Sequence, residues 1–471
     1  MIELRDYQEL GILQVDIEFK KGNRRVLLVA SPGAGKSEMA IYLMERAIRY
    51  KFPSLFIVRG RDLVNNISNR MDKNKLDHSV FMAKNWRFDK KKLIQAASVD
   101  TMFARKDFPF KDQNLLIILD EAHLDYSKVF EQYPNAFFIG LTGTPYSDMS
   151  IYDSFVQPIQ PFELRDRGYL VSDKIFCPHI IDTSSVKIRA GDFDKKELNS
   201  VVTQSAVIGN VIQDWKDLGE NRPTVCFATS IEHSLQLKQA FNEAGIPAVH
   251  CDASSSDEER KQARIDLESG KVKVLSNVDI FSTGWDCPMV SCVVLARPTW
   301  SLNWYLQAVG RGVRSYPGKS DCRVLDNAGN VFRHGTHFKV REISLDPPDK
   351  KKSRTYDTKI TNCEKCYLIY DPTIYEACPD CGHVKDKKAR KVNQIDGKLI
   401  EYEESPSEMQ ARRKKMIITK FYELEWGRKK GKLHPDWSFI QLFKTFSREE
   451  MVELKKVTVV PLRFLPIIPQ E

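Results

Sequence analysis

A glycine-rich turn between an apolar strand and an amphipathic helix constrains the fold of this chain more than any other feature. Residues 25–30 read Arg-Val-Leu-Leu-Val-Ala and predict a buried strand, and apolar residues recur at helical spacing over 38–47. The turn between them is Ser31-Pro32-Gly33-Ala34-Gly35-Lys36-Ser37. Glycines let backbone amides approach phosphate oxygens, and the N-terminus of the following helix presents further N–H groups to them. The pattern predicts a phosphate-binding loop in an α/β fold, in which Lys36 reaches the β- and γ-phosphates and the Ser37 hydroxyl suits Mg²⁺.

A second apolar strand ends in two acidic residues. Residues 115–119 read Leu-Leu-Ile-Ile-Leu, a continuous run typical of a strand that is buried on both faces of a parallel sheet. Asp120 and Glu121 follow directly, before Ala122 and His123. Ligands of open α/β sheets bind at the carboxyl ends of the strands. We therefore expect Asp120 to bind the magnesium shell and Glu121 to polarise the attacking water of a nucleoside triphosphatase.

With these two motifs in place, residues 1–340 resemble the superfamily 2 helicases and translocases, of the DEAH-box type. Leu4-Arg5-Asp6-Tyr7-Gln8 resembles the adenine-reading motif, which implies that Arg5 and Gln8 belong to the ATP site and that Gln8 contacts the base. Residues 56–61 and 97–101 resemble segments that touch the nucleic-acid backbone in this family. Residues 141–145 resemble the motif that couples hydrolysis to domain movement.

The second half of the chain resembles a second RecA-like domain. Residues 224–230 resemble its opening strand, and residues 276–286 resemble the fifth motif of the family, which implies that Gly284 and Asp286 contribute to the ATP site. Residues 307–314 resemble the sixth motif, which carries the arginine finger. That match implies the following site residues: Gln307, Arg311 and Arg314. The two guanidinium groups would face the γ-phosphate across the cleft and stabilise transition-state charge. The alternative for both arginines is a solvated helix end.

The type of nucleic acid is indicated by Thr142-Gly143-Thr144-Pro145, which departs from the Ser-Ala-Thr form of RNA helicases in the DEAD and DEAH groups. It is closer to DNA translocases, branch-migration enzymes and restriction-enzyme motor subunits, and residues 163–171 are similar to a bridging segment in DNA-acting members. The compact layout resembles the small branch-migration helicases of bacteria and large phages, the UvsW-like group. This resemblance implies a DNA helicase or translocase that remodels forks and four-way junctions in replication, recombination or repair.

Three other functions stay open at this point. An RNA helicase and the motor subunit of a restriction-type DNA translocase belong to the same motor class. A nucleic-acid-binding module with a degenerate motor is the non-enzymatic alternative. The presence of Lys36, Asp120, Glu121, Arg311 and Arg314 argues against a degenerate motor.

Length, composition and charge agree with a large soluble protein. The chain has 471 residues, enough for roughly three domains, and no run approaches the ~20 apolar residues of a membrane span. The N-terminus has no signal-peptide pattern, so we expect a cytoplasmic protein of a bacterial or phage-infected cell. The net charge is +9, and an excess of six basic residues lies within 341–471. Such an excess favours contact with phosphates, although a solubilising surface is an equally simple explanation.

Five segments are predicted along the chain. Residues 1–160 form a first RecA-like ATPase domain and residues 206–345 a second one, joined by an irregular bridging segment over 161–205. Prolines and a charge run then mark a composition break at 346–354. We assign residues 346–392 to a zinc-binding module and residues 393–471 to a mostly helical C-terminal domain.

The zinc-binding module is predicted from cysteine spacing. Cys363-x-x-Cys366 and Cys378-x-x-Cys381 each offer two thiolates on a tight turn, and two such turns complete a tetrahedron around Zn²⁺. Four thiolates leave no open position, so the metal would be structural; a disulfide pair is the alternative. Basic residues and tyrosines nearby suggest that the module grips DNA, and a rigid spacer that packs the tail onto the motor is the rival. The remaining six cysteines are expected to be small core residues: Cys177, Cys226, Cys251, Cys287, Cys292 and Cys322.

Overall fold

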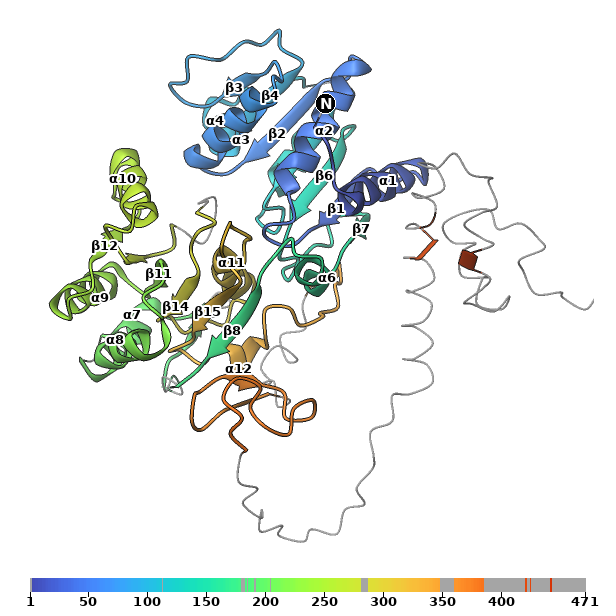
Figure 1. The fold of residues 1–471 in the computed structure, drawn as a ribbon. Coiled ribbons are helices and arrows are strands. Elements are labelled where there is room, and N and C mark those ends of the chain that lie inside the picture. The colour runs from blue at the N-terminus through green and yellow to red at the C-terminus, as the bar shows by residue number, and fades with distance from the viewer. Residues whose placement is uncertain are drawn as a thin grey trace, which may run out of the picture.

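Two parallel β-sheets form the framework of the molecule (Figure 1). The computed structural model describes residues 2–111, 113–178, 183, 185–189, 192–203, 205–280, 287–347 and 360–384, with five isolated positions beyond residue 419. The helical domain predicted for 393–471 therefore lies almost entirely outside the described residues. None of the described helices is long and apolar enough to cross a membrane.

The first domain is a seven-stranded sheet with the order β3-β4-β2-β5-β6-β1-β7. Every pair of neighbouring strands is parallel. The strands are β1 (Arg25–Val29), β2 (Ser54–Val58), β3 (Ser79–Phe81), β4 (Ile94–Ser98), β5 (Leu116–Asp120), β6 (Phe137–Thr142) and β7 (Ser154–Val156). The predicted strands at 25–30 and 115–119 are confirmed to within a residue as β1 and β5.

Helices cover both faces of this sheet because its strands are apolar on both sides. Val26 and Leu28 pack into one core cluster with residues of α1, α2 and α3, whereas Leu27 and Val29 pack into another with residues of α4 and α5. Successive side chains of a strand point to opposite faces, which explains the continuous apolar runs in the sequence. The helices are α1 (Asp6–Lys20), α2 (Lys36–Arg49), α3 (Arg61–Lys73), α4 (Val99–Arg105) and α5 (Ser127–Gln132).

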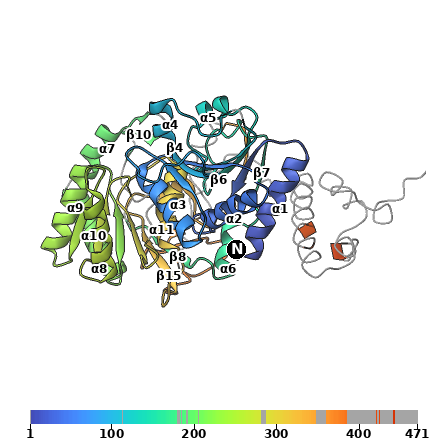
Figure 2. The same ribbon diagram turned by 90° about the horizontal axis from the view of Figure 1, so that it is seen from above.

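The second domain is a six-stranded parallel sheet with the order β12-β13-β11-β14-β15-β8. Figure 2 shows it beside the first domain, with α1 and α9 toward opposite ends of the described structure. Its strands are β8 (Ser172–Phe176), β11 (Thr224–Phe227), β12 (Ala248–Cys251), β13 (Val274–Asn277), β14 (Cys292–Leu295) and β15 (Asp321–Leu325). Its helices are α8 (Ser205–Leu218), α9 (Ile231–Glu243), α10 (Asp257–Glu268), α11 (Leu302–Gly312) and α12 (Asn330–His334).

The segment between the two domains is more regular than the sequence indicates. It contains α6 (Pro161–Asp166), the short antiparallel pair β9 (Ile188–Arg189) and β10 (Asp192–Phe193), and α7 (Lys195–Val202). It also supplies β8, which pairs in parallel with β15 and forms the edge of the second sheet. The expectation of an irregular bridge was therefore wrong for these residues. The domain boundaries themselves stay predictions.

The cysteine-rich module lies against this edge strand. A β-bridge joins Phe176 to Leu368, and the backbone N–H of Cys177 donates to the carbonyl oxygen of Tyr367 at 3.1 Å. The module contains the antiparallel pair β16 (Thr361–Asn362) and β17 (Ile369–Tyr370). Leu368 and Tyr370 are buried in the same core cluster as Phe176. The module is thus packed onto the second domain through apolar and backbone contacts.

Candidate nucleotide-binding and metal sites

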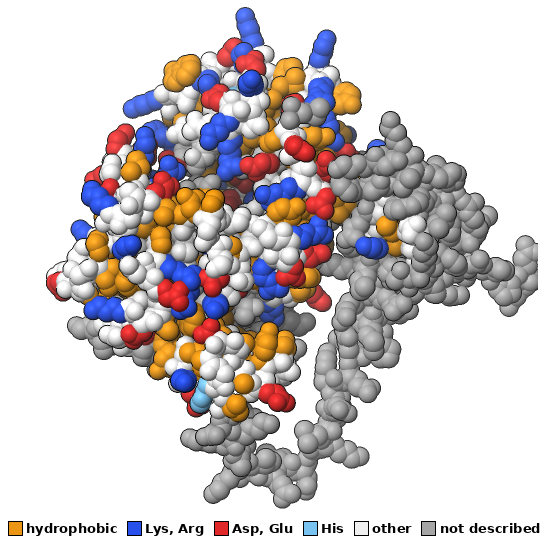
Figure 3. Space-filling view, in the orientation of Figure 1, with side chains coloured by type: hydrophobic (Ala, Val, Ile, Leu, Met, Phe, Trp, Pro, Cys, Tyr) orange, Lys and Arg blue, Asp and Glu red, His pale blue; other side chains and the backbone are white. Residues whose placement is uncertain are grey.

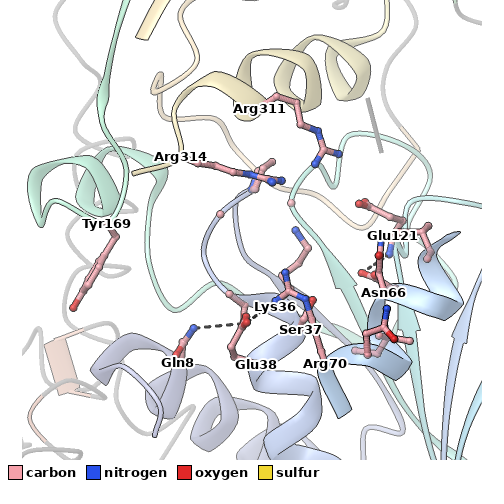
Figure 4. A pocket seen from close by; sticks show the side chains of 18 of the residues that line it. Gln8, Lys36, Ser37, Glu38, Asn66, Arg70, Glu121, Tyr169, Arg311 and Arg314 are labelled. Carbon is pink, nitrogen blue, oxygen red and sulfur yellow. Dashed lines mark hydrogen bonds and ion pairs between the residues drawn. The ribbon is translucent and has the colours of Figure 1, made fainter. Parts of the chain in front are cut away.

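A cleft of about 1150 Å³ lies between the two domains and brings most of the predicted ATP-site residues together. Figure 4 shows residues of the first domain on one side of it and residues of the second domain on the other. The predicted residues that line the cleft are Arg5, Gln8, Pro32, Gly33, Gly35, Lys36, Ser37, Asp120, Glu121, Gln307, Arg311 and Arg314. Gly284 and Asp286, which the fifth motif implies, lie outside the described residues.

The phosphate-binding loop has the conformation that its glycines allow. Gly35 is the N-cap of α2 and has φ 79°, a left-handed conformation that disfavours other residues. A Cβ atom there would lie 2.2 Å from Nε2 of Gln8. A Cβ atom on Gly310 of α11 would lie 2.9 Å from Cβ of Pro32. Glycine therefore lets both the N-terminal segment and the second domain approach the loop closely.

Side chains of the N-terminal motif, residues 4–8, donate hydrogen bonds to the backbone of the phosphate-binding loop. The Tyr7 hydroxyl and the Gln8 side-chain amide both donate to the carbonyl oxygen of Ala34, each at 2.9 Å. The Gln8 side-chain oxygen accepts from the backbone N–H of Arg5 at 2.9 Å. Burial raises the pKa of the Tyr7 hydroxyl. Gln8 thus stabilises the loop through its hydrogen bond to Ala34. Its contact with adenine stays a prediction.

The Arg5 side chain forms a platform with an aromatic ring at the mouth of the cleft. Its guanidinium group lies 4.2 Å from the ring centroid of Tyr169, and its Nη1 donates to the Tyr7 hydroxyl at 3.1 Å. Tyr169 belongs to the bridging segment and lines the cleft, where Figure 4 shows it on the same side as Gln8. No motif in the sequence assigns this tyrosine a role. It lies three residues before β8, the edge strand of the second sheet, and no local pattern indicates the pairing of β8 with β15.

The acidic pair has the electrostatics of a site that takes a cation. Burial and the adjacent Glu121 raise the pKa of Asp120 to about 6, and Lys36 opposes this shift. Glu121 adopts a left-handed φ of 47°, and its backbone N–H donates to Oδ1 of Asp120 at 3.0 Å. A divalent cation would favour the ionised form of this buried carboxyl group. The Ser37 hydroxyl lines the same cleft, so the donor set fits Mg²⁺.

A chain of polar contacts joins Glu121 to both domains. Nδ1 of His123 lies 3.4 Å from Oε2 of Glu121 and 3.2 Å from the Thr142 hydroxyl. From the second domain, Nε2 of Gln307 donates to Oε2 of Glu121 at 3.4 Å and lies 3.5 Å from Nε2 of His123. Burial lowers the pKa of His123, which favours the neutral ring at neutral pH. A single layer of side chains therefore connects β5, β6 and α11.

The arginines of the sixth motif enter the cleft from the second domain. Arg311 is buried on α11, and Arg314 lies just beyond the end of that helix, where a β-bridge joins it to Leu170. Figure 4 shows both guanidinium groups across the cleft from Gln8 and Ser37. The expected placement of basic side chains opposite the phosphate-binding loop is present.

A second charged pair borders the loop and was not anticipated. Nη1 of Arg70 donates to Oε1 of Glu38 at 2.5 Å, and both residues line the cleft. Glu38 lies in the first turn of α2, and Arg70 lies in the last turn of α3. The sequence gives no signal for this pair because the two helices meet only through the fold of the sheet.

The four clustered cysteines fit a tetrahedral metal site. The sulfur atoms of Cys363, Cys366, Cys378 and Cys381 all lie within 4.8 Å of one another. The Cys363–Cys381 and Cys366–Cys378 sulfur distances are 3.6 and 3.5 Å, close to the roughly 3.8 Å edge of a tetrahedron with Zn–S bonds of about 2.3 Å. None of the ten cysteines is in a disulfide, so the structure does not support the disulfide alternative. The other six are buried, as expected for core residues.

Two protein-family models match the chain. Residues 1–147 match the model described as the type III restriction enzyme res subunit, and residues 205–316 match the helicase conserved C-terminal domain. These two ranges lie on the two sides of the cleft. Both matches agree with the sequence-based assignment of two motor domains.

Several curated proteins are similar to the chain. A 51.5 kDa protein of Lactococcus phage (isolate 7-9) is 27% identical over 395 residues, which cover 80% of this chain and 82% of that protein. IRC3, a proposed ATP-dependent helicase of Saccharomyces cerevisiae, is 26% identical over 357 residues, or 69% of this chain. The chain spans about half of IRC3, 51% of its length. An endonuclease subunit of the Escherichia coli type I restriction enzyme EcoAI is 22% identical and covered over 48% of its length.

Solved structures share the fold. A fragment of an HsdR subunit of a type I restriction enzyme from Vibrio vulnificus gives a TM-score of 0.57 at 19% identity, covering 72% of this chain and 66% of that one. The type ISP restriction-modification enzyme LlaBIII, bound to DNA, gives a TM-score of 0.51 at 17% identity, covering 68% of this chain and 27% of that one. At these identities the likeness concerns the fold alone.

Proposed function

We propose that this chain, which matches the models of a type III restriction enzyme res subunit and of a helicase C-terminal domain, is a superfamily 2 helicase and an ATP-driven motor that moves along DNA. One observation carries the proposal. Lys36, Asp120 and Glu121 of the first domain line the same cleft as Gln307, Arg311 and Arg314 of the second. A triphosphate in that cleft would touch both domains, so its hydrolysis would change the contacts between them.

The residues of the chain supply positioning and charge for hydrolysis. The loop amides and Lys36 bind the phosphates, Ser37 and Asp120 hold Mg²⁺, and Glu121 orients the attacking water. The Mg²⁺ ion, when bound, neutralises developing charge on the phosphate oxygens. Arg311 and Arg314 stabilise the same charge from the second domain. Gln307 links Glu121 to α11, so the position of the water-activating carboxylate depends on the approach of the second domain.

Two features support DNA as the track. Thr142-Gly143-Thr144-Pro145 has the form found in DNA translocases rather than in RNA helicases, and Thr142 contacts His123 within the polar chain of the site. The relatives include endonuclease subunits of type I restriction enzymes, and one structure of the same fold is bound to DNA. We further propose that forks and four-way junctions are the preferred substrates, as the UvsW-like resemblance implies.

The cysteine cluster is proposed to hold one structural Zn²⁺ ion. Four buried or half-buried thiols at tetrahedral spacing leave no position for a substrate. The basic segments that suggested a grip on DNA, 350–354 and 385–391, lie outside the described residues. DNA binding by the module stays a prediction. Its packing against β8 supports a structural role.

The experiment that tests the proposed motor is an ATPase assay with a panel of nucleic acids. We expect single-stranded, forked and four-way-junction DNA to stimulate hydrolysis more than RNA of the same length. Lys36→Ala and Glu121→Gln should each reduce the stimulated rate at least about 100-fold, because each removes a group that acts on the transferred phosphoryl or its attacking water. Lys20→Ala and Glu131→Gln are matched controls at exposed helix positions and should hydrolyse ATP normally.

The outcomes separate the alternatives. Stronger stimulation by RNA would assign the chain to RNA helicases. Equal stimulation by linear single strands and junctions would remove the proposed preference for branched DNA. Absence of ATP hydrolysis with every nucleic acid, from a folded protein that still binds DNA, would favour a binding module with a degenerate motor.

A further inference from the structure

The carboxyl edge of the first sheet carries the functional segments in spatial order. All strands of this sheet are parallel, so the segments that follow them lie along one edge. From the phosphate-binding loop after β1, the order runs outward through Thr142–Pro145 and Asp120–Glu121 to residues 59–61 and 98–101. The last two are the ends of the segments 56–61 and 97–101, which resemble segments that contact the nucleic-acid backbone. The next strand outward is β3, and it is followed by a segment to which the sequence assigns no role.

This segment, residues 82–92, begins in direct contact with its neighbour on the edge. Phe81 pairs with Ala97, so the chain leaves β3 level with the end of β4. The backbone N–H of Ala83 donates to the Thr101 hydroxyl at 3.1 Å. The connection between β3 and β4 lies at the outer side of the first domain (Figure 1). The 82–92 segment therefore lies next in the row of segments that resemble nucleic-acid-contacting segments.

The segment presents one aromatic ring to solvent while its neighbours are fixed. Trp86 is 86% exposed, the most exposed large apolar side chain among the described residues. Phe88 packs on Phe81 with ring centroids 4.9 Å apart. Nη1 of Arg87 donates to Oδ2 of Asp72 at 2.7 Å and to the Ser68 hydroxyl at 3.2 Å. Because both following side chains are anchored, the indole is held outward rather than folded back onto the domain.

Two cationic side chains, Lys84 and Arg87, are close to Trp86 in the chain. The Arg87 guanidinium lies 5.3 Å from the Trp86 ring centroid. Lys84 is exposed, has a left-handed φ of 59°, and its ammonium group has no ion-pair partner among the described residues. Lys90 and Lys92, by contrast, are paired with Asp107 and Asp77. On the face shown in Figure 3, basic side chains are scattered over both domains and form no broad patch.

We propose that Trp86 stacks on an unpaired base of the DNA strand that this motor tracks, and that Lys84 contacts an adjacent phosphate. The inference rests on the proposed function, because it extends the DNA path beyond residues 98–101. An exposed indole beside cations is a typical single-strand contact, since every base offers a face for stacking and every nucleotide offers a charge. A site that binds a partner protein would instead need a broader exposed apolar surface than one ring among lysines and aspartates.

The test compares Trp86→Ala and Trp86→Phe in the full chain. Binding is measured by fluorescence anisotropy with a labelled single strand of about 20 nucleotides, longer than a typical site of roughly 4–16 nucleotides. Trp86→Ala should weaken binding about 5- to 150-fold, the equivalent of one lost base–aromatic stack, whereas Trp86→Phe should retain most of the affinity. A 2-aminopurine base in the strand should be quenched by the unmodified chain and less so by Trp86→Ala.

Tyr50→Ala is the matched control. Tyr50 is 79% exposed, but it is the C-cap of α2 at the opposite edge of the sheet, so its removal should leave binding unchanged. ATP hydrolysis without DNA should be unchanged in all three variants. Binding by Trp86→Ala that matches Tyr50→Ala would overturn the inference, as would an equal loss on a blunt duplex, whose bases are already stacked. If the unmodified chain binds no nucleic acid, the proposed function itself fails, which is a different result.

Discussion

Gln8 shows how one buried side chain can fix the shape of the glycine-rich loop through the loop's backbone. Its amide spans from the N–H of Arg5 to the carbonyl oxygen of Ala34, and Tyr7 reaches the same carbonyl. The sequence predicted that Gln8 belongs to the ATP site because its motif is local. Its partner Ala34 could not be predicted, because 26 residues and a strand separate them. The backbone conformation of the phosphate-binding loop therefore depends on Tyr7 and Gln8, which lie outside the loop motif.

Asp173 provides a residue-scale prediction of pH dependence. Burial raises the pKa of this carboxyl group to about 6, although Arg165, Arg341 and the backbone N–H groups of Asp173 and His337 oppose the shift. Its Oδ2 atom is buried without a hydrogen-bond partner in the described structure. The folded state thus binds a proton more tightly than the unfolded state does. The protonated Asp173 carboxyl group therefore stabilises the folded state fully below about pH 4, and this stabilisation is lost as the pH rises through 6.

Asp173→Asn is therefore expected to raise the melting temperature by a few degrees at about pH 8, where the buried charge is most costly. The gain should shrink as the pH is lowered through 6, because the carboxyl group of the unmodified chain becomes neutral. Thermal unfolding of both chains across this range measures the effect. The same gain at every pH, or a lower melting temperature at about pH 8, would show that the charge is compensated.

At the scale of elements, the two parallel sheets could be predicted from the sequence, but β8, the edge strand of the second sheet, could not. Strands such as Arg25–Val29 and Cys292–Leu295 are buried on both faces and appear in the sequence as continuous apolar runs. β8 reads Ser-Asp-Lys-Ile-Phe and is buried only in its second half, so the pattern is short and mixed. Its partner β15 begins about 150 residues later, at Asp321. Pairing over that separation is set by the packed domain rather than by local preference.

The cysteine-rich module completes this edge, which predicts the effect of metal removal. Lys174 of β8 pairs with Asp380 at 3.0 Å, and the side-chain amide of Asn362 donates to the carbonyl oxygen of Cys177 at 3.3 Å. A module this small depends on its metal for shape. We expect one Zn²⁺ per chain, and a chelator with a thiol reductant should remove it and lower the melting temperature of the second domain.

Cys378→Ser should lose the zinc and melt at a lower temperature without added chelator, because three thiolates bind the ion less tightly than four. Cys251→Ser is the control, since Cys251 is a buried thiol outside the cluster and its variant should keep one zinc. Elemental analysis and thermal unfolding measure the two effects. Chelator-treated protein that melts like the untreated protein would contradict a structural role for the metal.

At the scale of the whole molecule, two segments of the chain link the two domains. The first connection is the bridging segment that ends in β8. The second follows α12, where the Leu345 carbonyl oxygen accepts from the backbone N–H of Met149 and Ile343 packs on the first domain. The chain then returns to the second domain at the cysteine-rich module. The two domains are thus joined by the bridging segment and by the contacts of residues 343–345, which together limit how far the cleft can open.

One ion pair joins α10 of the second domain to α3 of the first. Nη1 of Arg260 on α10 lies 3.0 Å from Oδ2 of Asp62 in the first turn of α3. Asp62 is 53% exposed, so the pair should contribute only about 0.2–1 kcal/mol to the domain arrangement. Asp62→Asn and Arg260→Gln should therefore each raise the KM for ATP by at least about 1.4-fold and leave kcat unchanged. Arg260→Gln should act more strongly, because Arg260 also donates to the carbonyl oxygens of Asp252 and Ala253.

A double-mutant cycle isolates the contribution of this pair. If Asp62 and Arg260 interact only with each other across the cleft, Asp62→Asn should have no further effect once Arg260 has been replaced. The coupling should disappear at about 1 M salt, where charges are screened within about 3 Å. Asp16→Asn is the control, because the Asp16–Arg46 pair lies within the first domain and its loss should not change the KM. Additive effects at low salt would show that the cleft is held by the apolar and backbone contacts of the two connections, and that the ion pair only accompanies its closure.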